Sequence, residues 1–168
     1  RKQAEVALRE QRLFLETLME SIPVPLFYKD AQGRYLGCNF AFEDMSGLDR
    51  SQLIGKSVFD LFPPELAEKY HAMDSELFAW PGVQVYEWSV GKASGEIRSV
   101  VFHKASFQDA GGSVAGLIGA IMDVTERKMA EEQLRKLSLA VEQSPESIII
   151  TDIHAEIEYV NEAFVRAT

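Results

Sequence analysis

The chain has a single cysteine, no long apolar run and an excess of acidic over basic residues, and each of these features excludes a class of protein. One thiol, Cys38, cannot form a disulfide framework or a thiolate metal cluster, which indicates a reducing compartment. The longest apolar stretch, 114–122, has the length of a strand and falls short of the roughly 20 residues that span a bilayer. We therefore expect a cytoplasmic segment that makes no direct contact with a membrane.

The charge and the scarcity of reactive side chains narrow the function further. The 168 residues carry 26 acidic and 17 basic side chains, and a formal net charge of −9 repels phosphate backbones. We expect no nucleic acid as a direct partner. Three scattered histidines and one cysteine do not form the clustered nucleophile, base and orienting group that catalysis needs. We therefore expect no enzyme activity and no metal site in this segment.

A long internal repeat organises the chain. The stretch YKDAQGRYLGCNFAF at 28–42 returns as ITDIHAEIEYVNEAF at 150–164, with a constant offset of 122 residues between the two copies. Nine residues are identical at this offset: Glu10, Gln11, Leu15, Glu20, Pro23, Asp30, Asn39, Ala41 and Phe42 recur as Glu132, Gln133, Leu137, Glu142, Pro145, Asp152, Asn161, Ala163 and Phe164. So long a period is typical of tandem domains, because solenoid repeats run about 20 to 50 residues. We expect a full domain at 22–124 and the truncated start of a second at 145–168, both cut from a longer protein.

Each copy predicts a hairpin followed by a short helix. The run VPLFYKD reads as a strand, AQGR as a turn in which Gly33 supplies a positive φ, and RYLGCN as the second strand. The side chain of Asn39 can accept a hydrogen bond from the first helical turn and is a natural N-cap. We expect the helix to end at Gly47.

The remainder of the first domain predicts one long helix and three more strands. The helix begins at Pro64 and carries an apolar stripe of Leu66, Tyr70, Met73 and Leu77. Strand-like runs follow at 83–90, 97–107 and 114–124, joined by the hairpin segments GKASGE and QDAGGS. The order predicts an α+β fold with a five-stranded antiparallel sheet and short helices on one face.

Amphipathic helices are expected at both edges of this domain, over 1–21 and 125–144. Leu8, Leu15 and Ile22 are spaced by seven, and the second helix has a similar seam of Ala130, Leu134, Leu137 and Val141. Such a seam suits a helix that packs on its own domain or one that forms a coiled coil. We expect a homodimer formed through these flanking helices.

These features together resemble a PAS domain. FYKDAQGRYLGCNFAF resembles the opening of the family, and DVTERK at 123–128 resembles its closing Asp-x-Thr, which leads into a signalling helix. The resemblance covers roughly 22–128 and begins again at 145–168. It implies a tandem sensor or dimerisation module of a bacterial-type signalling protein, such as a sensor histidine kinase of a two-component system or a diguanylate cyclase. We expect the helix at 125–143 to pass a conformational change to an output domain, with Asp123 and Thr125 as relay residues.

The resemblance also implies a cavity beneath the helices. Its candidate lining residues, which could hold a flat cofactor or simply fill a closed core, are Phe27, Lys29, Tyr70, Met73, Trp88 and Phe102. Strand alternation places Lys29 on the face that lines such a cavity, where an ammonium group needs an anionic partner. That partner is either Glu43 or Asp44 of the following helix, or the carboxylate of a small-molecule ligand.

The sequence predicts no cofactor, although a small metabolite, flavin or haem are alternatives. Cys38 ends a strand and is followed by NFAFED, which departs from the motif of flavin photosensors, so we expect a buried structural thiol. His71 lies on the long helix in highly polar surroundings, so we expect a surface or packing residue and not a haem ligand. The runner-up functions are a ligand-free protein interaction scaffold and a redox or gas sensor.

Overall fold

The computed structural model describes residues 1–92 and 94–168, which form two separately packed units, Arg1–Val124 and Thr125–Thr168. The elements of the first unit are α1 (Lys2–Ser21), β1 (Leu26–Asp30), β2 (Tyr35–Cys38), α2 (Phe40–Ser46), α3 (Arg50–Leu53), α4 (Val58–Leu61), α5 (Pro64–Ala79), β3 (Val83–Gly91), β4 (Ile97–Gln108) and β5 (Val114–Asp123). The second unit contains α6 (Thr125–Glu142), β6 (Ile149–Thr151), β7 (Ile157–Val160) and α7 (Glu162–Ala167). None of the helices in the described part of the chain combines the length and apolar character that a bilayer-spanning segment needs.

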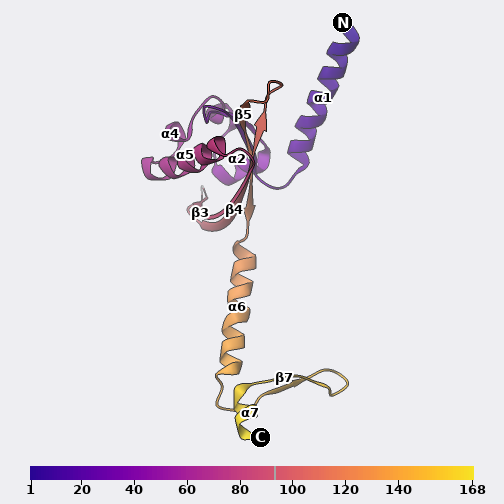
Figure 1. Ribbon diagram of the computed structural model, residues 1–168, viewed down its shortest axis with the longest axis vertical. Coiled ribbons are helices and arrows are strands. Elements are labelled where there is room, and N and C mark those ends of the chain that lie inside the picture. The colour runs from indigo at the N-terminus through magenta and orange to yellow at the C-terminus, as the bar shows by residue number, and fades with distance from the viewer. Residues whose placement is uncertain (93) are drawn as a thin grey trace. The chain divides into compact units, whose positions relative to one another are not determined.

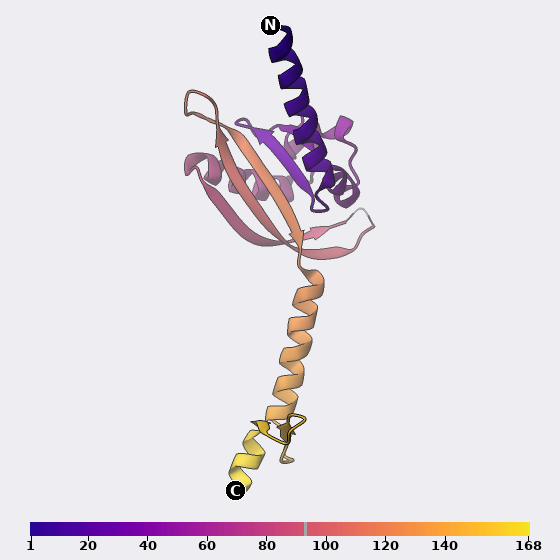
Figure 2. The same cartoon turned by 90° about the vertical axis from the view of Figure 1, so that its right-hand side faces the viewer.

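The first unit is a five-stranded sheet in the order β2-β1-β5-β4-β3, and every neighbouring pair is antiparallel. The predicted α+β fold is thereby confirmed. Helices α2 to α5 lie against one face of the sheet, and α1 lies on the side of the opposite face (Figures 1 and 2). The last strand, β5, pairs with both β1 and β4, so it occupies the centre of the sheet although it comes last in the unit.

The opening hairpin forms for the local reasons that its sequence indicates. Gly33 has a φ of 76°, a conformation that glycine adopts without the steric cost of a Cβ atom. Asp30 reinforces the turn, since its Oδ1 accepts hydrogen bonds from the backbone N–H groups of Gln32 and Arg34, each at 2.9 Å. Asn39 caps α2, and Gly47 ends it in the left-handed conformation, with a φ of 71°.

Strand alternation divides the sheet into an inner and an outer face. On β1 the buried residues are Phe27 and Lys29, while their neighbours Leu26 and Tyr28 turn to the outer face and are only partly buried. The inner face packs against the helices to form the hydrophobic core: Phe27, Tyr35, Cys38, Phe42, Leu53, Val58, Ala67, Leu77, Val90, Val100, Phe102, Leu117 and Ile121.

The long helix α5 begins at Pro64 as predicted, but its most buried line differs from the predicted stripe. Fully buried positions are Ala67, Asp74 and Leu77, whereas Leu66, Tyr70 and Met73 are only partly buried. A search for apolar residues at helical spacing could not find this buried line, because one of its three residues, Asp74, carries a carboxylate.

The second unit repeats the opening of the first. Strands β6 and β7 pair antiparallel, and their register shifts between Ile150 and Thr151, as the register of β1 and β2 shifts between Tyr28 and Lys29. All three residues of β6 are exposed, so this hairpin forms with its apolar side chains largely in solvent.

Candidate functional site

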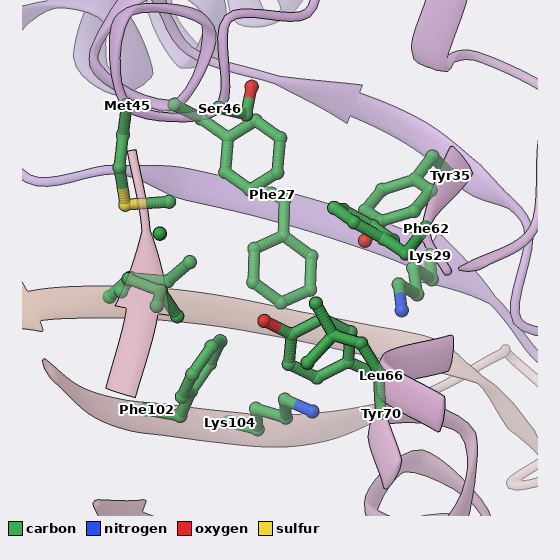
Figure 3. A pocket seen from close by; sticks show the side chains of 14 residues that line it. Phe27, Lys29, Tyr35, Met45, Ser46, Phe62, Leu66, Tyr70, Phe102 and Lys104 are labelled. Carbon is green, nitrogen blue, oxygen red and sulfur yellow. The ribbon is translucent and has the colours of Figure 1, made fainter. Parts of the chain in front are cut away.

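A cavity of about 110 Å³ lies between the inner face of the sheet and the helices (Figure 3). Its lining residues come from both layers: Phe27, Lys29, Tyr35, Phe42, Met45, Ser46, Phe62, Leu66, Tyr70, Val90, Gly91, Phe102, Lys104 and Ile121. Most of these side chains are apolar or aromatic, and two are lysines. The cavity therefore combines the apolar wall of a small-molecule site with a few charged groups that could orient a ligand.

Gly119 of β5 leaves room for the ring of Phe27, one of the lining residues. It lies between Phe27 of β1 and Lys104 of β4 in the register of the sheet. A Cβ atom at this position would lie 2.4 Å from the Phe27 ring, closer than any real contact allows. The absence of a side chain on β5 thus lets the Phe27 ring lie against the inner face of the sheet.

A buried charge cluster joins the two lysines to α5. The Nζ atom of Lys29 lies 2.6 Å from Oδ2 of Asp74, and the Nζ atom of Lys104 lies 2.6 Å from Oδ1 of the same carboxylate. The side chains are 2%, 2% and 4% exposed for Lys29, Lys104 and Asp74. Hydrogen bonds with both partners charged are short and strong, and here one carboxylate bridges two strands of the sheet.

Aromatic rings surround both ammonium groups. Nζ of Lys29 lies 4.4 Å from the ring centroid of Tyr35, and Nζ of Lys104 lies 5.1 Å from that of Tyr86. The electron-rich face of a ring attracts a cation at such distances. Burial nevertheless lowers the pKa of both lysines, because it penalises the charged form, and Asp74 offsets this effect only in part.

The predicted partner of Lys29 within the protein was wrong. Glu43 of α2 forms an ion pair with Arg50 at 2.8 Å, and the hydrogen bonds from Arg50 lower the pKa of that carboxyl group. Asp44, the other candidate, is exposed. Lys29 instead binds Asp74, which lies 45 residues further along the chain, so proximity in sequence was a poor guide to the pairing.

Asn39 holds together three segments at the edge of the core. Its Oδ1 accepts hydrogen bonds from the N–H groups of Leu26 (2.8 Å) and Phe42 (3.1 Å), which belong to β1 and α2. Its Nδ2 donates to the carbonyl of Met19 at the end of α1, at 3.1 Å, and to those of Ile22 and Val24 in the connection. Asn39 is fully buried, and it attaches the end of α1 to the core together with Glu20, which accepts a hydrogen bond from the N–H of Phe40 and pairs with Arg50.

Comparison with known proteins identifies the family. Residues 19–129 match the PAS fold family, and residues 132–168 match a second PAS domain family. This chain belongs to the PAS domain family.

Several relatives of this chain are sensor proteins of bacteria. The virulence sensor protein BvgS of Bordetella pertussis is 32% identical over 147 residues, and the aerobic respiration control sensor protein ArcB of Escherichia coli is 29% identical over 129 residues. These alignments cover 86% and 77% of this chain but only 12% and 17% of the relatives' own lengths. The solved PAS domain of Bordetella pertussis BvgS superimposes with a TM-score of 0.61 at 27% identity, covering 78% of this chain and 98% of that domain. The PAS chain described here is thus a signal-sensing module of the kind found in multidomain sensor proteins.

The structure brings four of the six predicted cavity residues together. Phe27, Lys29, Tyr70 and Phe102 line the cavity, and their role in binding stays a prediction. Met73 and Trp88 do not line it. Met73 is partly buried on α5, and its carbonyl accepts a hydrogen bond from Gln84.

Trp88 is absent from the cavity because it packs at the edge of the core. Its ring lies 5.0 Å from Nζ of Lys69, which is a side chain of α5. The size and aromatic character of Trp88 were therefore insufficient grounds for placing it in a site.

The sequence did not predict two charged residues of the cluster, Lys104 and Asp74. A signal existed for Lys104, since it falls two residues after Phe102 in a strand and must share the face of Phe102. Asp74 offered no comparable signal, because it lies in the polar run AEKYHAMDSE and only the fold shows that this position faces inward.

The residues considered for cofactors lie outside the cavity. Cys38 is buried, and burial raises the pKa of its thiol to about 11, so it is predominantly a neutral thiol at physiological pH. His71 is exposed and its ring lies 5.2 Å from that of Phe59. Among the described residues, no three His, Cys, Asp or Glu side chains gather in a way that could hold a metal ion.

The cavity also does not fit flavin or haem. An engineered protein cavity of about 150 Å³ holds a molecule as small as benzene, and the space here is about 110 Å³. A ring system several times larger would require the helices to separate from the sheet.

Proposed function

We propose that this PAS domain senses a small molecule in its cavity and passes the resulting change through α6 to an output domain of a longer protein. The supporting observation is the position of β5. This strand pairs with both β1 and β4, which carry the two lysines, and its own Ile121 lines the cavity. Only Val124 separates the end of β5 at Asp123 from the start of α6 at Thr125.

The junction between strand and helix is held by β4. Val124 is 7% exposed, and its N–H donates a hydrogen bond to the carbonyl of Ser99 at 2.9 Å. Arg98, next to Ser99, lies 3.8 Å from the Asp123 carboxylate. A change in the cavity that shifts β4 against β5 is therefore able to alter the first turn of α6, as small shifts of packed elements do in other switches.

The existence of a cavity supports a sensor over a ligand-free scaffold, because an interaction module gains nothing from an internal space that costs packing energy. We propose further that the segment does no chemistry itself, that it resides in the cytoplasm and that any catalysis belongs to the output domain. The absence of long apolar helices among the described residues is compatible with that location.

The relay is tested in the full-length parent protein by replacing Asp123 or Thr125 with alanine and measuring output over the whole range of its signal. We expect output that no longer follows the signal, with thermal stability of the PAS domain little changed. Asp44→Ala is the matched control, since it removes an exposed carboxylate from α2, away from the junction. Normal output from both relay variants would refute this route.

We also propose that two copies of the chain pair through the flanking helices. The apolar seam of α1 is unpartnered, with Leu8 69% and Leu15 52% exposed, and α6 exposes Leu134 and Leu137 in the same way. A second copy can cover such seams by coiled-coil packing.

Light scattering on the whole chain tests this pairing. We expect a dimer for the natural sequence and a monomer for a variant that carries both Leu15→Glu and Leu134→Glu. A chain that is already monomeric at high micromolar concentration would contradict the proposal.

A further inference from the structure

The cavity wall contains two cations and no anion. Lys29 and Lys104 belong to the fourteen residues that line it, and no Asp or Glu does. Asp74, which binds both ammonium groups, is not among the lining residues. Figure 3 shows the amino groups of both lysines on the side of the cavity where Tyr70 lies.

The charge of this cluster is unbalanced. Two ammonium groups face a single carboxylate, so the fully ionised cluster carries one net positive charge on side chains that are almost completely buried. Both oxygens of Asp74 are already used, one by each lysine. A buried charge without a counter-charge is costly, and proteins keep such groups where a ligand or a proton shift balances them.

The hydrogen bonding of the lysines is also incomplete. An ammonium group has three N–H donors, and within the described residues each lysine donates to Asp74 alone. Aromatic rings of Phe27, Tyr35, Tyr86 and Phe102 lie 4.4 to 5.5 Å from the two ammonium groups, and such ring faces attract a cation but accept hydrogen bonds only weakly. Both lysines can therefore take a further acceptor without giving up Asp74.

We propose that the cavity binds a small monocarboxylate, with its carboxylate between the ammonium groups of Lys29 and Lys104. Its hydrocarbon part would contact Phe27, Phe102 and Ile121, which supply the apolar wall. This inference rests on the proposed sensory function and names its ligand class.

Three observations select this class. One negative charge makes the cluster neutral, which favours a monoanion over a dicarboxylate or phosphate. The lining is mainly apolar, which favours a hydrocarbon chain over a sugar or an inorganic ion. A volume of about 110 Å³ holds roughly four to six non-hydrogen atoms, which is the size of propionate or butyrate.

Binding is tested on the whole chain by equilibrium dialysis and thermal melting with butyrate, at constant ionic strength. Butyramide has the same shape without the charge, and phosphate has the charge without the hydrocarbon chain. We expect one butyrate per chain and a raised melting temperature, with no effect of butyramide or phosphate. Failure of butyrate to bind, or equal effects of butyramide or phosphate, would overturn the proposal.

Variants locate the site. Lys104→Met leaves a neutral pair of Lys29 and Asp74, so we expect the affinity for butyrate to fall at least about tenfold. Lys56→Met is the matched control, since it removes the same charge from an exposed position. Retention of butyrate binding by Lys104→Met, or its loss from Lys56→Met, would place the ligand elsewhere.

A second variant tests the site by removing the anion of the cluster instead of a cation. Asp74→Asn removes the natural counter-charge of both lysines, so butyrate should raise its melting temperature more than that of the natural chain. An equal or smaller increase would count against the site.

Measuring the output of the full-length parent protein distinguishes a failure of the proposed ligand from a failure of the proposed sensory function. Butyrate binding that leaves output unchanged would retain the ligand site and refute the sensory role. No binding, combined with output that still depends on Asp123, would refute the ligand and retain the sensory relay.

Discussion

The two copies of the repeat share their local geometry and differ in what surrounds it. Asn161 accepts hydrogen bonds from Ile148 and Phe164 at 2.9 and 3.1 Å, and donates to Val141 of α6 at 3.1 Å. These partners lie at the same offset from Asn161 as Leu26, Phe42 and Met19 lie from Asn39. The hairpin turn is repeated as well, with Asp152 in the place of Asp30.

The surroundings of the two copies are nevertheless different. In the first unit β1 pairs with β5, and its inner face is buried beneath α5. In the second unit only β6 and β7 pair, and β6 is exposed. Lys29 has a threonine, Thr151, as its counterpart, so the charge cluster belongs to the first unit alone. The asparagine arrangement is thus encoded locally, whereas the cavity requires residues far apart in the chain.

The two asparagines attach helices to the two units in the same way. Asn39 attaches the end of α1 to the first domain, and Asn161 attaches the end of α6 to the second hairpin in the same manner. If α6 carries the signal out of the first domain, as we propose, the hydrogen bonds of Asn161 to Val141 and of Tyr159 to Glu142 are the contacts through which the second hairpin would receive it.

The largest expected effect comes from Asp74→Asn, which acts only on the first unit. Two buried ammonium groups lose their carboxylate, so we expect a loss of about 3–5 kcal/mol in the free energy of unfolding. Urea denaturation measures it. Asp44→Asn is the control and should change stability by less than about 0.5 kcal/mol. A small effect of Asp74→Asn would mean that the lysines are neutral in the folded chain.

Asn39→Ala and Asn161→Ala compare the two copies directly. Each removes a buried cap and leaves backbone donors and acceptors without partners, at a cost of about 3 kcal/mol to the unit concerned. Hydrogen exchange should accelerate at Leu26 and Phe42 in the first variant, and at Ile148 and Phe164 in the second. Acceleration of both sets in either variant would show that the two units unfold together.

The pH dependence of the free energy of unfolding should differ between the two units, because only the first contains the buried lysines Lys29 and Lys104. Their pKa values lie below the ordinary 10.5 in the folded state, so the unfolded chain binds more protons and stability rises as the pH approaches 10.5. Tyr70 acts in the opposite direction above about pH 10, since burial raises its pKa to about 12.

The measurement is therefore made from about pH 7 to about pH 9, below the ordinary tyrosine pKa of about 10. We expect the stability of the natural chain to rise over this range relative to that of Lys104→Met. Parallel curves for the two proteins would contradict the lowered pKa values.

The smallest effect concerns the turns. Gly33 has a φ of 76°, and its counterpart Ala155 has a φ of 63°, where a Cβ atom is unfavourable. Gly33→Ala should destabilise the first unit by about 1 kcal/mol, and Ala155→Gly should stabilise the second hairpin by a similar or smaller amount. Hydrogen exchange of the strand amides beside each turn measures both. Stabilisation by Gly33→Ala, or destabilisation by Ala155→Gly, would show that the two turns are not equivalent.

The sequence by itself determined the features that depend on neighbouring residues. The hairpin turn, the cap at Asn39, the helix start at Pro64 and the antiparallel strands that follow could all be predicted, because each depends on contacts within a few residues. The fold class followed from the order of these elements. The repeat at an offset of 122 residues predicted that the same local structure would form twice.

Only the tertiary structure decided the site. Lys29, Asp74 and Lys104 come from β1, α5 and β4, and a buried carboxylate in a polar stretch of helix leaves no periodic signal. The predicted partner Glu43 lay closer in sequence but is held by Arg50. A buried ion pair forms where folding excludes water from both groups, and the packing of a helix onto a sheet determines that place.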